Sequence, residues 1–584
     1  MNDVWELDSI YRGFGDPAFE RDLTALQALV SKSDEYMAKL SQAEPFEGLK
    51  TGIALLEEIS ELAEKLAGYA VLRQAADTKD PEAASKVGQV MAVISDTAAS
   101  EAAFRAWAAK LPNLLELAEA DEKLKDYHFL LSNMEKSSRY LLGGRGEEIV
   151  AKLHLSGSNA WSDLQQYLTS TVEVSYRGET LTLSSVRNLA YDPDPLVRKD
   201  AFDAELACYE KIKDAVAFAL NSIKLETISD CQLRGYASAL ARTLEKDHMQ
   251  KQTLDAMLAA MEEYLPRFRK YLKAKSKALG HDGGLPWYDL FAPMGSSSTR
   301  FTTESAREYL VGVFAGFDDE LSRMVATAFD NAWIDFYPRE GKSGGAFCAG
   351  VKCLGESRIL TNFNGLFTDI VTLAHELGHA FHNRCIRDHR PLNRDYSMPL
   401  AETASTFNEC VVMAAAIDAA ADREEKLALI ESQLQDATQI ICDIYSRYLF
   451  ETSVFADRQA QFMDAQVLCD KMLQAQKKAY GDGLEESTLH PYMWLCKSHY
   501  YGATFYNYPY AFGGLFARGL YAQYEKEGAD FVPKYKKLLR ITTVATAEDT
   551  AKVAGIDLTD KEFWRSALQT IADQIDMFCQ LTEQ

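Results

Sequence analysis

The sequence is poor in the features that mark secreted and membrane proteins. Its ten cysteines form no Cys-x-x-Cys pair and no dense framework, which is the usage expected in a reducing compartment. The first residues, MNDVWELDSIYRGFGDP, lack a basic segment followed by an apolar one. No run in the chain approaches the roughly 20 apolar residues that span a bilayer. We therefore expect a cytoplasmic protein with no membrane partner.

Positive charge is also scarce. The chain has 86 acidic and 62 basic residues, a formal net charge of -24, and no long block of one sign. Binding to nucleic-acid phosphates requires a basic surface. A nucleic-acid partner is therefore not expected, and the acidic balance indicates a highly soluble surface.

Helical patterns dominate what the sequence does contain. Hydrophobic residues make up 47% of the chain, so it can bury large cores and divide into more than one lobe. Over residues 17–155, apolar positions return at steps of three and four residues, as in ALLEEISELAEKLAGYAVLRQAAD. This pattern predicts a lobe built almost wholly of amphipathic helices.

Strand patterns are few and short. TVEVSYRGETLTL (171–183) alternates on both sides of an Arg-Gly pair and predicts a β-hairpin. Residues 333–365 hold short β-prone pieces and several glycines ahead of a helical segment, which predicts a small sheet next to that helix. The prolines of YDPDPLVRKDAF interrupt the helices. We predict a mainly α fold with an N-terminal helical lobe over 1–195, which includes the hairpin, and a second domain over 196–584.

The segment DIVTLAHELGHAFHNR (369–384) places histidines and a glutamate inside an apolar run. On a helix, His375 and His379 lie one turn apart on one face, so both rings can direct a nitrogen to one ion about 2 Å away. Glu376 points to the side of that face, where its carboxylate can reach a zinc-bound water without being a ligand. The pattern alone fits either a zinc site or polar residues on a buried helix. Buried His and Glu side chains need a partner that offsets their desolvation, and a metal ion would be such a partner. Gly378 destabilises the helix but leaves room for substrate or a strand. Both observations favour a zinc site.

A third ligand is expected nearby, because a zinc ion that keeps one open position needs three protein ligands. SMPLAETASTFNE (397–409) predicts a helix that begins at Pro399 and carries Glu402 in its first turns. We predict Glu402 as the third ligand. Glu409 lies on the same face, where it either holds a ligand histidine or is a solvated carboxylate. A fourth protein ligand would close the site, so His382 either supports the site or belongs to the core.

TLAHELGHAFH, followed by PLAETAST, resembles the oligoendopeptidase F branch of the thimet-oligopeptidase-like zinc metallopeptidases, which are gluzincins. Further segments support the likeness along nearly the whole chain: VWELDSIY, PLVRKDAF, LPWYDLFAP, REGKSGGAFC, ILTNFNG, HYYGATFYNYPYAFG and GIDLTDKEFW. The resemblance implies two helical lobes that enclose a deep substrate channel, with one zinc ion per chain held by His375, His379 and Glu402. It implies short peptides as substrates, because the channel would exclude folded proteins by size.

The resemblance also assigns roles to the tyrosine-rich segment HYYGATFYNYPYAFG. It implies that His499, Tyr506 and Tyr508 act as catalytic groups, which would hydrogen-bond the peptide carbonyl and the developing oxyanion. Tyr510 would contact the substrate. From the residues alone, such a cluster also fits ordinary packing, since tyrosine buries a large area and carries a polar tip.

The glycine-bounded segment GGAFCAG resembles the strand that pairs with the substrate main chain in this family. Gly345, Ala346 and Phe347 are the residues that would make these contacts. Main-chain pairing would bind peptides with little sequence preference.

These observations lead to the hypothesis of a zinc-dependent oligoendopeptidase, in which residues 196–584 form the catalytic domain. Glu376 would take a proton from the zinc-bound water and pass it to the leaving amine. A carboxypeptidase or dipeptidyl carboxypeptidase would use the same chemistry but needs a cation, such as Arg339 or Lys342, for the terminal carboxylate of the peptide. A non-catalytic peptide-binding protein with a structural zinc would have no need of Glu376. The sequence does not indicate an oligomeric state.

Overall fold

The computed structural model describes residues 2–296 and 299–583, and helices make up most of them. The predicted mainly α fold with small sheets is therefore confirmed, and so is the helical character of residues 17–155. Within the described part of the chain, no helix combines the length and the apolar character that a membrane span needs.

Each of two compact units is assembled from three segments that lie far apart in the sequence. The first unit consists of Met1–Gly144, Thr299–Ala415 and Gln523–Gly555, and the second consists of Arg145–Ser298, Ala416–Ala522 and Ile556–Gln584. These units do not follow the single boundary predicted near residue 195. The reason is that helices pack on partners hundreds of residues away, as α13 (Lys251–Ala278) does on α26 (Lys561–Glu583). A division into separately folding domains at residue 195 stays a prediction.

The helices belong mostly to one unit or the other. Those of the first unit are α1 (Pro17–Met37), α2 (Pro45–Ala76), α3 (Pro81–Ala108), α4 (Leu114–Glu119), α5 (Glu122–Lys125), α6 (His128–Ser137), α14 (Thr303–Ala315), α15 (Asp319–Asp330), α16 (Phe367–Ile386), α17 (Thr403–Ala419), α24 (Val532–Ile541) and α25 (Ala547–Lys552). Those of the second unit are α7 (Gly144–Ser156), α8 (Ser158–Thr171), α9 (Leu183–Asn188), α10 (Pro195–Tyr209), α11 (Lys213–Arg234), α12 (Ala239–Lys246), α13, α18 (Arg423–Thr438), α19 (Ile444–Arg458), α20 (Ala465–Tyr480), α21 (Met493–Cys496), α22 (His499–Gly502), α23 (Tyr508–Glu527) and α26.

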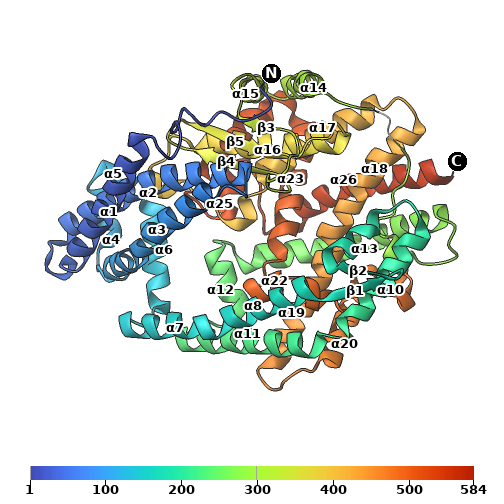
Figure 1. The fold of residues 1–584 in the computed structure, drawn as a ribbon, viewed down its shortest axis with the longest axis horizontal. Helices are drawn as coiled ribbons and strands as arrows, with labels where there is room; N and C mark the ends of the chain where they lie inside the picture. The colour runs from blue at the N-terminus through green and yellow to red at the C-terminus, as the bar shows by residue number, and fades with distance from the viewer. Residues whose placement is uncertain (1, 297–298, 584) are drawn as a thin grey trace. The chain divides into compact units, whose positions relative to one another are not determined.

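Helices α1, α2 and α3 pack against one another in the first unit (Figure 1). Each begins with a proline, after an acidic residue whose side chain accepts a backbone N–H of the first turn. Their apolar faces form a core around Tyr11, Leu66 and Tyr69. Val351 of strand β4 (Phe347–Val351) and Leu360 of strand β5 (Glu356–Leu360) join this core. The strands are thus fixed against the N-terminal helices.

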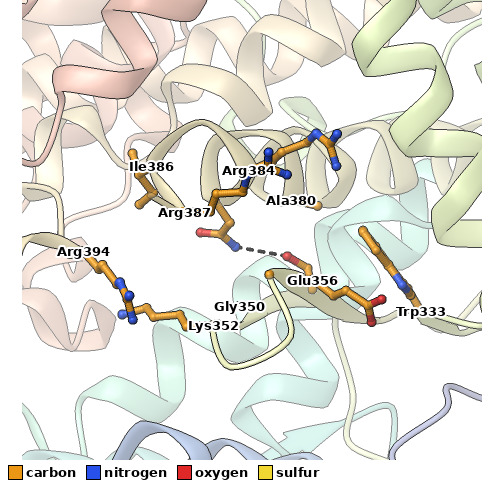
Figure 2. A pocket seen from close by; sticks show the side chains of 12 residues that line it. Trp333, Gly350, Lys352, Glu356, Ala380, Arg384, Ile386, Arg387 and Arg394 are labelled. Carbon is orange, nitrogen blue, oxygen red and sulfur yellow. Dashed lines mark hydrogen bonds between the residues drawn. The ribbon is translucent and has the colours of Figure 1, made fainter. Parts of the chain in front are cut away.

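The sheet of the first unit has the strand order β3-β5-β4. Strand β5 (Glu356–Leu360) pairs parallel to β3 (Ile334–Asp335) and antiparallel to β4 (Phe347–Val351). Strand β4 is therefore an edge strand, and none of the described residues pairs with its outer side. Its side chains alternate in direction: Val351 joins the core of α1–α3, whereas Gly350 faces α16 (Figure 2). The predicted small sheet next to the motif helix is confirmed.

The predicted hairpin is present in the second unit as β1 (Glu173–Tyr176) and β2 (Glu179–Thr182). The two turn residues, Arg177 and Gly178, have φ angles of 47° and 87°. Positive φ at both positions is the requirement of a type I′ turn, which matches the twist of two antiparallel strands. The hairpin packs on α10.

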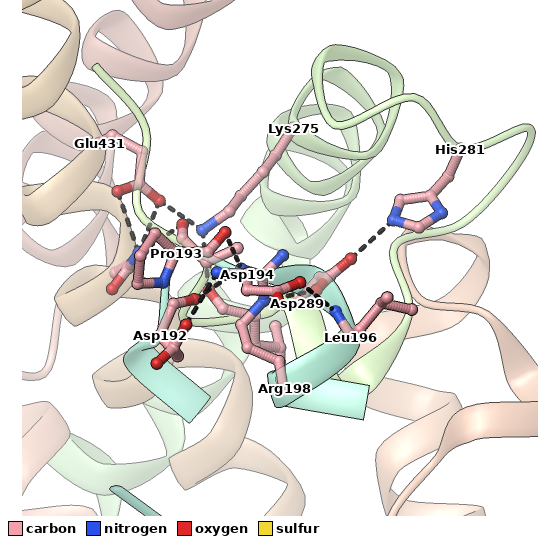
Figure 3. A network of polar contacts seen from close by, with 12 residues as sticks. Asp192, Pro193, Asp194, Leu196, Arg198, Lys275, His281, Asp289 and Glu431 are labelled. Atoms are coloured by element: carbon pink, nitrogen blue, oxygen red, sulfur yellow. Dashed lines mark hydrogen bonds and ion pairs between the residues drawn. The ribbon is translucent and has the colours of Figure 1, made fainter. Parts of the chain in front are cut away.

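A buried polar network holds the Gly- and Pro-rich loop 280–293 in the second unit (Figure 3). Arg198 Nε donates to Asp289 Oδ1 at 2.7 Å, and His281 Nε2 lies 2.6 Å from the other carboxylate oxygen. Lys275 Nζ donates to the carbonyl of Leu290 at 2.9 Å. Because the charges of Arg198, Lys275 and Asp289 are removed from water, each needs its partner to remain stable. These contacts pack the loop against the helices of the second unit.

Candidate metal centre

Helix α16 presents the predicted zinc-binding residues. Its first turn is fixed by Asp369, whose carboxylate accepts the backbone N–H groups of Asn364 and Leu366 at 2.8 and 2.9 Å. Its apolar side chains are buried against the sheet and α24. This leaves His375 and His379 partly exposed, with their rings 4.9 Å apart.

The donor atoms of the three predicted ligands converge. Glu402 Oε2 lies 3.3 Å from His375 Nε2 and 3.3 Å from His379 Nε2. Two ligands that are each about 2 Å from a tetrahedral zinc ion lie roughly 3.3 Å apart, so this spacing fits the ion. Among the described residues, these three form the one group of His, Cys, Asp and Glu that is arranged to hold a metal.

The position of Glu402 differs from the prediction in one respect. The chain forms a short 3-10 helix over Met398–Leu400, and α17 begins only at Thr403, so Glu402 precedes the helix. There its carboxylate accepts a hydrogen bond from Ser405 Oγ at 2.7 Å. This bond orients the oxygen that faces the two histidines.

Gly378 has a different role from the predicted one. A Cβ atom at this position would lie 2.5 Å from the carbonyl oxygen of Ala404 and 2.6 Å from Cα of Ser405. The backbone of α17, not a substrate or a strand, therefore occupies the space beside the glycine. Close contact between α16 and α17 brings Glu402 to the histidines.

Glu409 contacts the metal centre from α17. Its carboxylate hydrogen-bonds Nδ1 of His375, which is the supporting contact of the two predicted alternatives. With Nδ1 as the donor, Nε2 carries the lone pair that a metal needs. Desolvation lowers the pKa of His375, but the hydrogen bonds with Glu402 and Glu409 outweigh it and raise the pKa to about 10. The two carboxylates thus favour a positive charge at this place, as a bound cation would supply.

Glu376 lies beside the donor set with its side chain buried. Desolvation raises the pKa of its carboxyl group, while the two neighbouring histidines act in the opposite direction. Its carboxylate forms no hydrogen bond or ion pair with the described residues, so it is available to a bound molecule.

His382 lies in the core of the first unit, and a supporting role at the centre stays a prediction. It is fully buried, its Nε2 lies 2.8 Å from Thr542 Oγ1, and burial lowers its pKa to about 3. Thr542 donates its own hydroxyl proton to the carbonyl of Leu539, so it accepts from His382. The ring of His382 stacks on Tyr396 at 4.4 Å with an interplanar angle of 9°. Sequence reasoning missed Tyr396, because a single aromatic residue in a turn carries no periodic signal.

The chain matches known proteins along its whole length. Residues 188–570, well over half of the chain, match the family model for Peptidase family M3. The chain belongs to peptidase family M3. Residues 111–173 match the family model for Oligopeptidase F, which places the chain in the oligoendopeptidase F branch. Membership of an M3 family makes it a peptidase.

Relatives and solved structures agree with this membership. Oligopeptidase PepF of Bacillus subtilis is 24% identical over 98% of this chain and 86% of its own length. An oligoendopeptidase F homologue of Lactococcus lactis is also 24% identical, over 99% and 97% of the two chains. The structure of oligoendopeptidase-F from Enterococcus faecium superposes with a TM-score of 0.71 at 17% identity, covering 97% of this chain and 99% of that one. A chain from Chlamydophila abortus that was assigned as a peptidase gives a TM-score of 0.87 at 20% identity, over 99% and 98%.

In this M3 peptidase the segment GGAFCAG leads into edge strand β4. Gly345 and Ala346 lie in a bend before the strand, and Phe347 is the first residue of the strand. Gly345 has a φ angle of +76°, which glycine adopts at little cost, and its carbonyl accepts from Asn362 Nδ2 at 2.9 Å. The unpaired outer edge of β4 offers main-chain groups to an extended peptide. Pairing with substrate stays a prediction.

The two candidate cations for an exopeptidase are engaged elsewhere in the first unit. Arg339 binds the carboxylate of Asp335 through two nitrogens, at 2.6 and 2.8 Å. Lys342 Nζ binds the same carboxylate at 2.7 Å, and its side chain is fully buried. Neither side chain is therefore available to bind the terminal carboxylate of a peptide.

The tyrosine-rich segment lies in the second unit, where three of its rings form a cluster. His499 lies 5.0 Å from Tyr506 and 5.6 Å from Tyr510, measured between ring centroids. Burial, followed by the charges of Arg447 and Lys497, lowers the pKa of His499. The ring is thus favoured in its neutral form, and its Nδ1 has no hydrogen-bond partner among the described residues.

The structure disagrees with the predicted role of Tyr508. Its side chain is fully buried, and its hydroxyl donates to Asp247 Oδ2 at 2.5 Å. A hydroxyl whose proton is held by a buried carboxylate is not free to donate to an oxyanion. Tyr508 positions the start of α23. Its contact with Asp247 could not be predicted from the tyrosine-rich segment, because the two residues are 261 positions apart in the sequence.

A buried ion pair that the sequence analysis missed also supports this segment. Lys224 Nζ lies 2.7 Å from Glu451 Oε1, and both side chains are 1% exposed. The same carboxylate accepts from the backbone N–H of Phe505 at 3.2 Å and from Asn507 Nδ2 at 3.1 Å. Phe505 has a φ angle of 50°, an uncommon value for a non-glycine residue, so these bonds hold a strained turn.

Proposed function

We propose that the chain is a zinc-dependent oligoendopeptidase, which hydrolyses internal bonds of short, unstructured peptides. The observation that carries this proposal is the convergence of His375, His379 and Glu402 beside a carboxylate, Glu376, that has no partner among the described residues. One zinc ion per chain would be held by the three ligands. When bound, it would polarise the scissile carbonyl and lower the pKa of the attacking water.

The residues around the ligands move and hold protons. Glu376 accepts the proton of the attacking water and delivers it to the leaving amine nitrogen. Its burial raises its pKa, which makes it a stronger base than an exposed glutamate. Glu409 accepts the Nδ1–H of His375 and so keeps Nε2 in the form that binds a metal.

The outer edge of β4 supports binding of an extended peptide. Main-chain groups at Phe347 and beyond would pair with the substrate, while Gly345 and Ala346 place no bulky side chain in its path. Such pairing recognises the peptide backbone and not its side chains. It fits a peptidase that accepts many sequences.

For stabilisation of the oxyanion we propose His499 and Tyr506 of the second unit, with Tyr510 as a substrate contact. Tyr508 is left out because its hydroxyl is donated to Asp247. Removing one oxyanion donor lowers kcat by about 100- to 1000-fold in other hydrolases. His499→Phe and Tyr506→Phe should therefore lower kcat with unchanged zinc content, and variants with the parent's kcat would contradict these roles.

An exopeptidase remains the alternative with the same zinc chemistry. Product analysis separates the two: peptides of one sequence with blocked and with free termini are digested, and the fragments are identified by mass spectrometry. An endopeptidase cleaves both sets at the same internal bonds. Release of one or two residues from free C-termini, with no cleavage of the blocked peptides, would contradict the proposal. Loss of cleavage with a chelator and its return with zinc tests the metal in the same assay.

A further inference from the structure

A cavity of about 500 Å³ lies between α2 and the end of β4 in the first unit. One face of α2 forms its first wall, because the lining residues recur at helical spacing: Glu58, Glu61, Leu62, Lys65, Gly68 and Tyr69. The opposite wall is the end of β4 with the turn that follows it, Gly350 to Cys353, and the side chain of Arg394. Gly68 has no atom near the place of a Cβ, which leaves the wall of α2 open at this point.

Two residues of the edge strand β4, Gly350 and Val351, line the cavity. Residues that lie directly opposite each other on neighbouring strands project to the same face of a sheet. Val351 projects toward α1–α3, so a peptide residue paired opposite Val351 would project toward α2 and enter the cavity.

On the opposite face of β4, the cavity lined by the described residues is much smaller. A residue paired opposite Gly350 would project toward α16, where the cavity drawn in Figure 2 lies among Gly350, Ala380 and Arg387. That cavity holds only about 30 Å³, which is room for one or two water molecules and not for a side chain. Of these two cavities, the one on the α2 side is large enough to hold a substrate side chain.

The floor of the large cavity is apolar and its rim is acidic. Ile10, Leu29 and Leu62 contribute apolar surface. Glu58 and Glu61 are exposed on α2 and form no hydrogen bond or ion pair with the described residues. An apolar floor below free carboxylates suits a side chain with a long methylene stem and a cationic end.

The cations that line the cavity are largely neutralised by their own partners. Lys65 Nζ binds Asp22 at 2.8 Å, and Lys352 Nζ binds Glu64 at 2.7 Å. The second oxygen of Glu64 is buried without a partner among the described residues. Arg394 is the remaining cation among the lining residues. The carboxylates of Glu58 and Glu61 on α2 therefore dominate the charge near an entering side chain.

We propose that this cavity is a substrate subsite that gives the peptidase a preference for peptides carrying lysine or arginine at one position. The preference rests on the proposed function, because it requires that peptides pair with β4. Glu58 and Glu61 determine the specificity: they attract the cationic end, while the apolar floor holds the stem.

The test uses fluorescence-quenched peptides of one sequence in which a single position, moved along the peptide, is lysine, glutamine or glutamate. Wild-type protein should show one position where lysine gives a higher kcat/KM than glutamate. In the Glu58→Gln/Glu61→Gln variant this ratio should fall by roughly five- to tenfold, the scale of two partly exposed ion pairs. The kcat/KM for the glutamine peptide should stay within about twofold of the wild-type value.

A matched control removes the same charge elsewhere. Asp34→Asn/Glu35→Gln changes two exposed carboxylates of α1 that do not line the cavity, and it should leave the lysine-to-glutamate ratio unchanged. Charge reversal in Glu58→Lys/Glu61→Lys should shift the preference toward glutamate at the same position.

The outcomes separate the subsite from the proposed function. Normal hydrolysis with an unchanged ratio in Glu58→Gln/Glu61→Gln would overturn the subsite and leave the peptidase proposal in place. If the wild type hydrolyses none of the peptides, the proposed function fails. Fluorescence anisotropy of labelled lysine and glutamate peptides then decides the subsite, because equal affinity of the wild type for both would overturn it.

Discussion

Replacing Gly378 by alanine should disrupt the metal centre without touching a ligand. The new Cβ would lie 2.5 Å from the carbonyl oxygen of Ala404, whereas ordinary contacts of a Cβ begin near 3.4 Å. The Cβ is fixed to the backbone of α16 and the carbonyl oxygen belongs to the backbone of α17, so the two helices must separate by roughly 1 Å. That movement carries Glu402 away from His379.

Two opposing effects set the size of the change. Overpacking costs typically about 1–3 kcal/mol, while alanine is favoured over glycine inside a helix by about 1 kcal/mol. The free energy of unfolding should therefore fall by about 0–2 kcal/mol. A misplacement of about 1 Å in a catalytic centre lowers activity by about 100-fold, so kcat/KM should fall on that scale, and the affinity for zinc should fall as well.

Gly312→Ala is the matched control, since this glycine is exposed in α14 and no atom lies near its Cβ position. It should raise the free energy of unfolding by about 0.5–1 kcal/mol and leave kcat/KM unchanged. Denaturant unfolding in a chelator, zinc titration and peptide hydrolysis measure the three quantities. If Gly378→Ala matches Gly312→Ala in all three, the reasoning about the helix contact is refuted.

Three further changes test other parts of the structure. Glu409→Gln removes the charged acceptor of the Nδ1–H of His375 and should weaken zinc binding by about 10- to 100-fold, measured by chelator competition; an unchanged affinity would count against the contact. Glu205 is desolvated, but the charge and hydrogen bond of His490 lower its pKa from 4.5 to about 2. It should contribute about 3 kcal/mol of stability above pH 4.5, and this contribution is lost as the pH falls toward 2. The free energies of unfolding of Glu205→Gln and the wild type should therefore differ at pH 7 and become equal in acid. A difference that stays constant with pH would contradict this. Tyr508→Phe leaves a buried carboxylate without its donor and should cost about 1–3 kcal/mol of unfolding free energy, whereas a variant as stable as the parent would show that the bond contributes nothing.

The convergence of the residues in the candidate metal centre could be predicted because it depends largely on helical spacing. Residues four positions apart lie on one face of any α-helix, so His375 and His379 share a face. Glu402 follows them closely in the sequence. The start of α17 was placed too early, at Pro399, because a proline opens a 3-10 turn as readily as a longer helix.

Features that depend on distant contacts could not be predicted from periodicity. The three-segment units arise from helix pairs hundreds of residues apart, and no local pattern records such a pairing. Tyr508 and Tyr506 look alike in sequence, yet one is buried against Asp247 and the other lies in a partly exposed ring cluster. The need for a glycine at position 378 could not be predicted either, because the backbone that it contacts belongs to another helix, α17.

The central claim is that Glu376 moves the proton while His375, His379 and Glu402 hold the metal. The most direct measurement is the zinc content of Glu376→Gln, by elemental analysis, together with its rate of peptide hydrolysis. We predict one zinc ion per chain, as in the wild type, and a kcat lowered by about 100- to 10,000-fold. Hydrolysis at the wild-type rate by this variant, or a wild type that retains full activity without any metal, would contradict the account.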